Sequence, residues 1–104
     1  MKFANTFGDT VKKLRDEKNL PLREVAEALN IDTSMLGKIE KNNRKPTKEL
    51  IKKIAKFFKV NTKDLTIAFI SDTVVYQIID EDFPSEVLKV AEEKVKYLKT
   101  KKKS

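Results

Sequence analysis

The sequence predicts an all-α fold, and three observations support this prediction. Apolar residues recur every three or four positions along most of the 104-residue chain, which is the period of one face of a helix. Asp, Thr and Ser residues, which favour helix N-termini, stand where several of these periodic segments begin. Breaks that contain Asn or Pro separate the segments from one another.

The first expected helix covers residues 3–18, where the apolar residues recur at intervals of four, four and three: Phe3, Phe7, Val11 and Leu14. A second, short helix is expected over residues 22–29. Pro21 suits its first turn, because a residue there needs no partner for its N–H group. Asn30 follows, and asparagine tolerates the left-handed conformation that a tight turn requires.

The third expected helix begins after Asp32, a favourable N-cap, and carries Leu36 and Ile39 on its inner side. A polar run over residues 42–46 ends it. Thr47 is the expected cap of a fourth helix. The apolar side of that helix is formed by Leu50, Ile51, Ile54, Phe57 and Phe58.

The segment over residues 62–80 is rich in residue types that also favour strands. On a helical wheel, however, four of its polar residues fall in one narrow strip: Thr66, Thr73, Gln77 and Asp80. We therefore predict a helix, with Asn61 as its cap. Because this helix is apolar over most of its surface, it needs cover on two sides. We expect a second subunit to supply one of them.

A last helix is expected after Ser85, a favourable cap, with its apolar residues in one stripe: Val87, Leu88, Ala91, Val95 and Leu98. The expected organisation is a first domain over residues 1–61 and a dimerising helical extension over residues 62–98. The lysine-rich tail over residues 99–104 is expected to be disordered.

The charge of the chain is unevenly distributed. The formal net charge is +7, and the first 59 residues hold 15 Lys and Arg against 8 Asp and Glu, whereas residues 60–98 hold 4 against 8. Nine of the basic residues lie between Lys38 and Lys59, where only Glu40 and Glu49 oppose them. Such a surface suits a polyanion, because neutralised phosphates release their counterions. A solvated face that keeps a small protein soluble is the alternative.

Several classes of function are excluded by composition. The chain has no Cys and no His, so disulfides, thiolate or imidazole metal sites and His- or Cys-based nucleophiles are absent. Neither Gly8 nor Gly37 belongs to a phosphate-binding loop. The acidic group at residues 80–82 is expected to be a solvated loop rather than a divalent-ion site. We therefore expect no catalytic residue, metal or cofactor.

No apolar run is long enough to span a membrane, and the N-terminus lacks the apolar core of a signal peptide. These two features lead us to expect a cytoplasmic protein without membrane contact.

Residues 22–41, LREVAEALNIDTSMLGKIEK, have the features of a helix-turn-helix. Ala26 is small enough for two helices to cross closely, and Asn30 lies in the turn. The apolar positions that fix the crossing are Val25, Leu29, Ile31, Leu36 and Ile39. With the Ile-Glu pair, the basic loop that contains Pro46 and the following LIKKIA helix, this segment resembles the phage-repressor and Cro type (XRE) helix-turn-helix family over about residues 7–65.

The resemblance implies a lambda-repressor-like five-helix domain, here extended by a C-terminal helix. It also implies a sequence-specific regulator of transcription that binds a palindromic operator in double-stranded DNA as a homodimer, with a nucleoid-associated location in a bacterium or phage. Short relatives of this kind include controller proteins of restriction-modification systems and small phage repressors. An antitoxin-like protein, which binds a partner protein through its C-terminal helices and regulates itself through DNA binding, is the alternative function.

In this family the second helix of the motif enters the major groove, which assigns base contacts to Thr33, Ser34 and Lys38, with Met35 beside them. The alternative is that Thr33 and Ser34 only favour a first turn and that Lys38 is solvated. One departure from the family is visible, because Pro21 and Leu22 stand where relatives often have Ser and then Gln. A side-chain amide contact is therefore lost at this position.

The basic loop and the helix after it supply the expected phosphate contacts: Lys41, Arg44, Lys45, Thr47 and Lys48. Arg15 and Glu40 form a structural pair in some relatives, and both residue types are present here. The alternative for Arg15 is a phosphate contact or a solvent-facing charge.

A homodimer interface is expected from apolar residues of the last two helices: Ile67, Ile70, Val74, Ile78, Leu88 and Val95. The alternative is that these helices complete a larger monomeric core.

Overall fold

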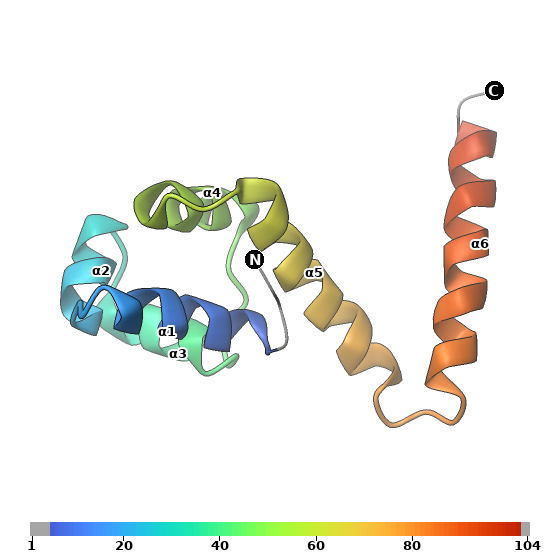
Figure 1. The fold of residues 1–104 in the computed structure, drawn as a ribbon, viewed down its shortest axis with the longest axis horizontal. Helices are drawn as coiled ribbons and strands as arrows, with labels where there is room; N and C mark the ends of the chain where they lie inside the picture. Colours follow the sequence, from blue (N-terminus) through green and yellow to red (C-terminus); the bar gives the residue numbers. More distant parts are fainter. Residues whose placement is uncertain (1–4, 103–104) are drawn as a thin grey trace. The chain divides into compact units, whose positions relative to one another are not determined.

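The computed structural model describes residues 5–102, which form six α-helices and no strand (Figure 1). The predicted all-α class is thus confirmed. The helices are α1 (Phe7–Glu17), α2 (Leu22–Ala28), α3 (Thr33–Glu40), α4 (Lys48–Phe58), α5 (Thr62–Ile78) and α6 (Pro84–Lys102).

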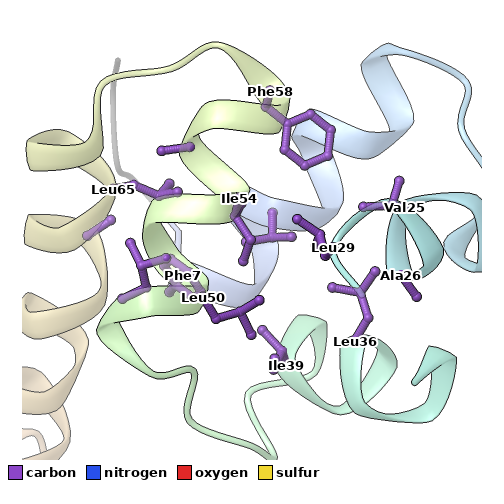
Figure 2. Close-up of a cluster of buried hydrophobic side chains, with 14 residues drawn as sticks. Phe7, Val25, Ala26, Leu29, Leu36, Ile39, Leu50, Ile54, Phe58 and Leu65 are labelled. Carbon is purple, nitrogen blue, oxygen red and sulfur yellow. The ribbon is translucent and has the colours of Figure 1, made fainter. Parts of the chain in front are cut away.

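The buried core is built by α1 to α4, by Leu29, which is the C-cap of α2, and by the first part of α5. Figure 2 shows the side chains from these helices converging on one another. The buried apolar residues of the described chain are Phe7, Val11, Val25, Ala26, Leu29, Leu36, Ile39, Leu50, Ile51, Ile54, Ala55, Phe58, Leu65 and Ala68. Apart from the last two, they occupy the inward positions that helical periodicity gives to each segment. Leu65 and Ala68 add one turn of α5 to this core.

Two of the predicted caps are confirmed, and one further cap is found. The Thr47 hydroxyl oxygen accepts a hydrogen bond from the Leu50 N–H at 3.1 Å, and the Asn61 side-chain oxygen accepts from the Asp64 N–H at 3.1 Å. At the start of α1, the Thr6 hydroxyl accepts from the Asp9 N–H at 3.2 Å. Each of these bonds satisfies an N–H group that has no partner within its helix. Helix α1 thus begins at Phe7, and the expected contribution of Phe3 lies outside the described residues.

Helices α2 and α3 begin at the expected positions, but the roles of Pro21 and Asp32 differ in detail, and the start of α6 differs from the prediction. Pro21 is the N-cap of α2, with an extended backbone (φ −67°, ψ 152°), and is not in the first turn. Asp32 holds the N-cap position of α3, but its side chain makes no capping hydrogen bond. Ser85 lies inside α6, which begins at Pro84 because the fixed φ of proline already suits a first helical turn.

Left-handed backbone conformations mark the ends of four successive helices, with asparagines after the first three and Lys59 (φ 56°) as the C-cap of α4. Asn19 after α1, Asn30 after α2 and Asn42 after α3 have φ of 53°, 58° and 62°. Asparagine adopts this conformation at a lower cost than most residues do. The expected tight turn at Asn30 is thereby confirmed.

The chain divides into two compact units, one up to Asp72 and one from Thr73 onward. The boundary falls within α5, which continues to Ile78 as one helix. In α6 none of the described residues is buried. Residues 99–102, which were expected to be disordered, continue this helix, and the rest of the expected tail, residues 103–104, lies outside the described residues.

Candidate nucleic-acid interface

Helix α3 has a buried side and an exposed polar side. Leu36 and Ile39 are 0% and 1% exposed, whereas Thr33, Ser34 and Lys38 are exposed. At 100° per residue, the three exposed side chains fall within an arc of about 140°. The sequence-predicted base contacts are therefore brought together on one outward face of α3.

Met35 differs from the other predicted base contacts. Its side chain is half-buried and packs against the hydrophobic core. Only part of this side chain is therefore presented to the outside, beside the exposed Ser34.

The crossing of α2 and α3 is fixed at the turn between them. Ala26 is buried, and its carbonyl oxygen accepts a hydrogen bond from the Ile31 N–H at 3.0 Å. The Asn30 N–H donates to the Glu27 carbonyl oxygen at 3.0 Å. These bonds close the turn directly after α2, so that the chain re-enters a helix at Thr33. The outward face of α3 is thus held on a rigid support.

A basic loop follows α3. Pro46 in this loop is buried and anchors it, while the predicted phosphate contacts are exposed: Lys41, Arg44, Lys45, Thr47 and Lys48. Within residues 5–102, none of these four cations or Lys38 takes part in a salt bridge. Their charge is therefore not neutralised by the chain itself. Basic side chains next to the N-terminus of α4, where N–H groups point outward, are suited to bind phosphate.

Arg15 and Glu40 are brought together by the structure. The Arg15 Nε and Nη2 donate to the two carboxylate oxygens of Glu40 at 2.8 and 3.0 Å, and Nη1 donates to the Leu20 carbonyl oxygen at 2.9 Å. The side chains are only 14% and 6% exposed. The hydrogen bond to Glu40 is the main cause that raises the pKa of Arg15, although burial acts in the opposite direction. The guanidinium thus remains charged where it links α1 to the end of α3.

Asn42 has a positioning role that the sequence reasoning missed. Its side-chain oxygen accepts a hydrogen bond from the Gly8 N–H at 3.0 Å, and its Nδ2 donates to the Thr6 hydroxyl at 2.8 Å. These bonds attach the end of α3 to the first turn of α1. Periodicity gave no sign of them, although an Asn directly after a helix indicates a left-handed residue there.

Gly8 permits this close approach of α1 to α3. A Cβ atom at Gly8 would lie 2.7 Å from the Ile39 carbonyl oxygen and would also collide with the carbonyl oxygen of Glu40. A side chain at this position is therefore incompatible with the observed packing.

Large apolar side chains of α5 and α6 are exposed. The predicted interface residues Ile67, Ile70, Val74, Leu88 and Val95 are between 41% and 53% exposed, and Ile78 is half-buried. Single exposed apolar residues are normal on a protein surface, whereas several large ones on one helix are typical of an interaction surface.

Two features are absent from the described part of the chain. No helix there is both long and apolar enough to cross a lipid bilayer. Likewise, residues 5–102 contain no group of three or more acidic side chains placed to hold a metal ion.

Comparison with known proteins identifies relatives of the motif segment. The helix-turn-helix family profile matches residues 11–65. The HTH-type transcriptional regulator SutR of Escherichia coli strain K12 is 38% identical over 52 residues, which are 50% of this chain and 29% of that protein. The chain therefore spans less than a third of the length of this curated relative.

The fold also has a solved counterpart. The crystal structure of the clp gene regulator ClgR from Corynebacterium glutamicum matches with a TM-score of 0.57 at 22% identity, over 88% of this chain and 95% of that one. At this identity the match establishes the fold. Since the family profile covers more than half of the chain and includes α2, α3 and the basic loop, the protein belongs to the XRE-type helix-turn-helix family of DNA-binding regulators.

Proposed function

We propose that the protein is a transcriptional regulator that binds a palindromic operator as a homodimer, with α3 of each copy in the major groove of one half-site. The observation that carries this proposal is the exposed row of Thr33, Ser34 and Lys38 on α3, directly followed by a basic loop whose charges are unpaired. A helix fits the width of the major groove, and phosphate contacts on its flank fix its register.

The exposed side chains of α3 have the chemistry for reading base edges. The Lys38 ammonium can donate hydrogen bonds to O6 and N7 of guanine. Thr33 can form a hydrogen bond or place its methyl group against the methyl group of thymine. Ser34 lies on the same exposed face and adds a hydroxyl group. In this proposal, Lys38 and Thr33 discriminate between base pairs.

The phosphate contacts are assigned to the basic loop. Arg44 and Lys45 supply charge, Lys41 and Lys48 flank them, and the N–H groups of the first turn of α4 point outward behind Thr47. The start of α2 offers fewer groups for phosphate contacts, because Pro21 has no N–H group and Leu22 is apolar. In this proposal the loop after α3 therefore makes most of the contacts to the DNA phosphate backbone.

The homodimer is supported by the exposed apolar residues of α5 and α6. One helix-turn-helix reads few base pairs, and two copies related by two-fold symmetry read two half-sites about one helical turn apart. A second copy of the chain would also remove water from side chains such as Ile67, Val74 and Val95, which the single chain leaves about half exposed.

Selection of bound fragments from random duplex DNA tests the proposed reading of bases. We expect enrichment of a palindromic consensus, which would report binding, two-fold symmetry and half-site spacing together. Absence of any preference over bulk genomic competitor DNA, even in dilute buffer, would contradict the proposed function.

Sedimentation of the purified protein tests the proposed assembly. We expect a dimer at tens of micromolar, and a monomer at that concentration would contradict the homodimer. If a second polypeptide co-purifies with the native protein in place of a second copy, an antitoxin-like role replaces the homodimer.

A further inference from the structure

The first turn of α1 is hydrogen-bonded to two distant parts of the chain. The buried Phe7 donates its N–H group to the carboxylate Oδ2 of Asp72 in α5 at 2.6 Å. The next N–H group, that of Gly8, donates to Asn42 directly after the C-cap of α3 at 3.0 Å. Two adjacent N–H groups at the start of α1 thus connect the end of α3 with α5.

Asp72 completes a contact face along α5. Leu65 and Ala68 are buried, and the Phe69 ring stands edge-on to the Phe7 ring with centroids 5.5 Å apart. Positions 65, 68, 69 and 72 follow the i, i+3, i+4, i+7 pattern of one helix face. Asp72 is the last of them and also the last residue of the first compact unit.

The bond from Phe7 to Asp72 differs from the apolar contacts before it. Burial of apolar surface is non-directional, so Leu65, Ala68 and Phe69 hold α5 against the core but fix its tilt less closely than a directional bond does. A short hydrogen bond to a carboxylate is directional, and a negative charge is favourable at a helix N-terminus. Asp72 therefore restrains the direction of α5 at the point where this helix leaves the unit.

We infer that Asp72 is a specificity-determining residue that sets which half-site spacing the protein accepts. This inference rests on the proposed homodimer and its palindromic operator. In such a dimer the half-site spacing mirrors the separation of the two recognition helices, and one base pair corresponds to about 3.4 Å along the duplex. Helix α5 connects the domain that carries α3 with the residues proposed to form the dimer. A small change in the direction of α5 is therefore enough to shift the preferred half-site spacing.

The test measures affinity for duplexes that carry two consensus half-sites whose separation changes in steps of one base pair, and for a duplex with one half-site. The wild type is expected to prefer one separation by about tenfold over its neighbours, which corresponds to about 1.4 kcal/mol and is within the range of one hydrogen bond. Asp72→Ala is expected to reduce this preference to about threefold or less and to leave the affinity for a single half-site unchanged.

Two further variants separate positioning from charge. Asp72→Asn keeps an oxygen that can accept from the Phe7 N–H, and it is expected to retain the spacing preference. Asp80→Ala removes a carboxylate from an exposed position, and it is expected to behave as the wild type. Hydrogen exchange of the Phe7 amide provides a second readout, since exchange should be faster in Asp72→Ala than in Asp72→Asn.

If Asp72→Ala lowers affinity equally at all separations, or leaves the preference intact, Asp72 only stabilises the fold and the inference is overturned while the proposed function stands. If the wild type binds two half-sites no more tightly than one, the proposed homodimer fails and the inference fails with it. Should Asp72→Ala not fold, Phe69→Leu removes the ring contact on the same face of α5 and is expected to weaken the spacing preference likewise.

Discussion

Arg15 and Glu40 form a two-pronged ion pair between α1 and the last residue of α3, with N–O distances of 2.8 and 3.0 Å. Two parallel hydrogen bonds fix orientation as well as distance. Because the pKa of Arg15 is raised, the contribution of its charge to stability is fully present below the pKa of the unfolded chain. That contribution is lost only as the pH rises through the higher folded value, at strongly alkaline pH. The pair thus links α1 to the end of α3 at every pH below that strongly alkaline range.

Glu40→Gln is predicted to destabilise the protein. The change leaves the Arg15 guanidinium in a mostly buried site with a neutral partner, for which we expect a loss of about 1–3 kcal/mol in the free energy of unfolding. Urea denaturation followed by circular dichroism measures this loss. Glu24→Gln, at an exposed position of α2, serves as the control and should change little. Unchanged stability together with unchanged DNA affinity in Glu40→Gln would remove the pair from the account of α3 orientation.

Gly8→Ala and Gly37→Ala are predicted to have opposite effects. The added Cβ at Gly8 would overlap backbone oxygens of α3, so we expect a loss of about 1–3 kcal/mol or more from overpacking. Gly37 lies inside α3. A Cβ there would meet only the Leu22 Cδ2 of α2 at 3.4 Å, which is an ordinary van der Waals contact. There the replacement should stabilise the protein by about 0.5–1 kcal/mol. Thermal unfolding of both variants checks the contrast, and equal shifts of Tm in the same direction would refute it.

Lys38→Ala is predicted to relax sequence preference at one base pair of each half-site. Loss of a good contact to guanine reduces discrimination there by about 1–3 kcal/mol and leaves the preferences at other positions in place. Competition binding with a set of single-base operator variants measures the effect. Lys63→Ala removes an exposed lysine of α5 and is the matched control. A uniform loss of affinity across all variants would instead place Lys38 on a phosphate.

Arg44→Ala is predicted to weaken binding to all sequences alike. Loss of one phosphate contact should flatten the slope of log K against log salt by roughly one unit and leave base preferences unchanged. Titrations at several salt concentrations, with operator and with unrelated duplex, provide the measurement. If Arg44→Ala and Lys38→Ala lost specificity to the same extent, the proposed division between loop and helix would not hold.

Local features of the fold could be predicted from the sequence because they depend on neighbours in the chain. The spacing of apolar residues placed the helices, and Thr47 and Asn61 were identified as caps that the structure shows. Asn30 was predicted to be left-handed and has φ 58°. These features depend on residues at most four positions away, which is the range over which helical periodicity and capping act.

Contacts between distant residues could not be predicted in the same way. Periodicity shows which side of a helix is inward, but not which N–H group an acceptor reaches. The bonds from Phe7 to Asp72 and from Gly8 to Asn42 span 65 and 34 residues. The pair of Arg15 and Glu40 was expected only because relatives carry it. The start of α6 was predicted wrongly, because proline suits the first helical turn and the helix begins at Pro84, two residues earlier than a cap at Ser85 implies.

The buried apolar side chains of the described residues all lie between Phe7 and Ala68, and Asp72 in α5 accepts a hydrogen bond from the first turn of α1. The helix-turn-helix unit therefore does not draw its hydrophobic core from the segment that follows. Such an arrangement is modular. A chimaera in which an unrelated coiled coil follows Asp72 would keep the same helix-turn-helix domain. Its oligomeric state would be set by the coiled coil.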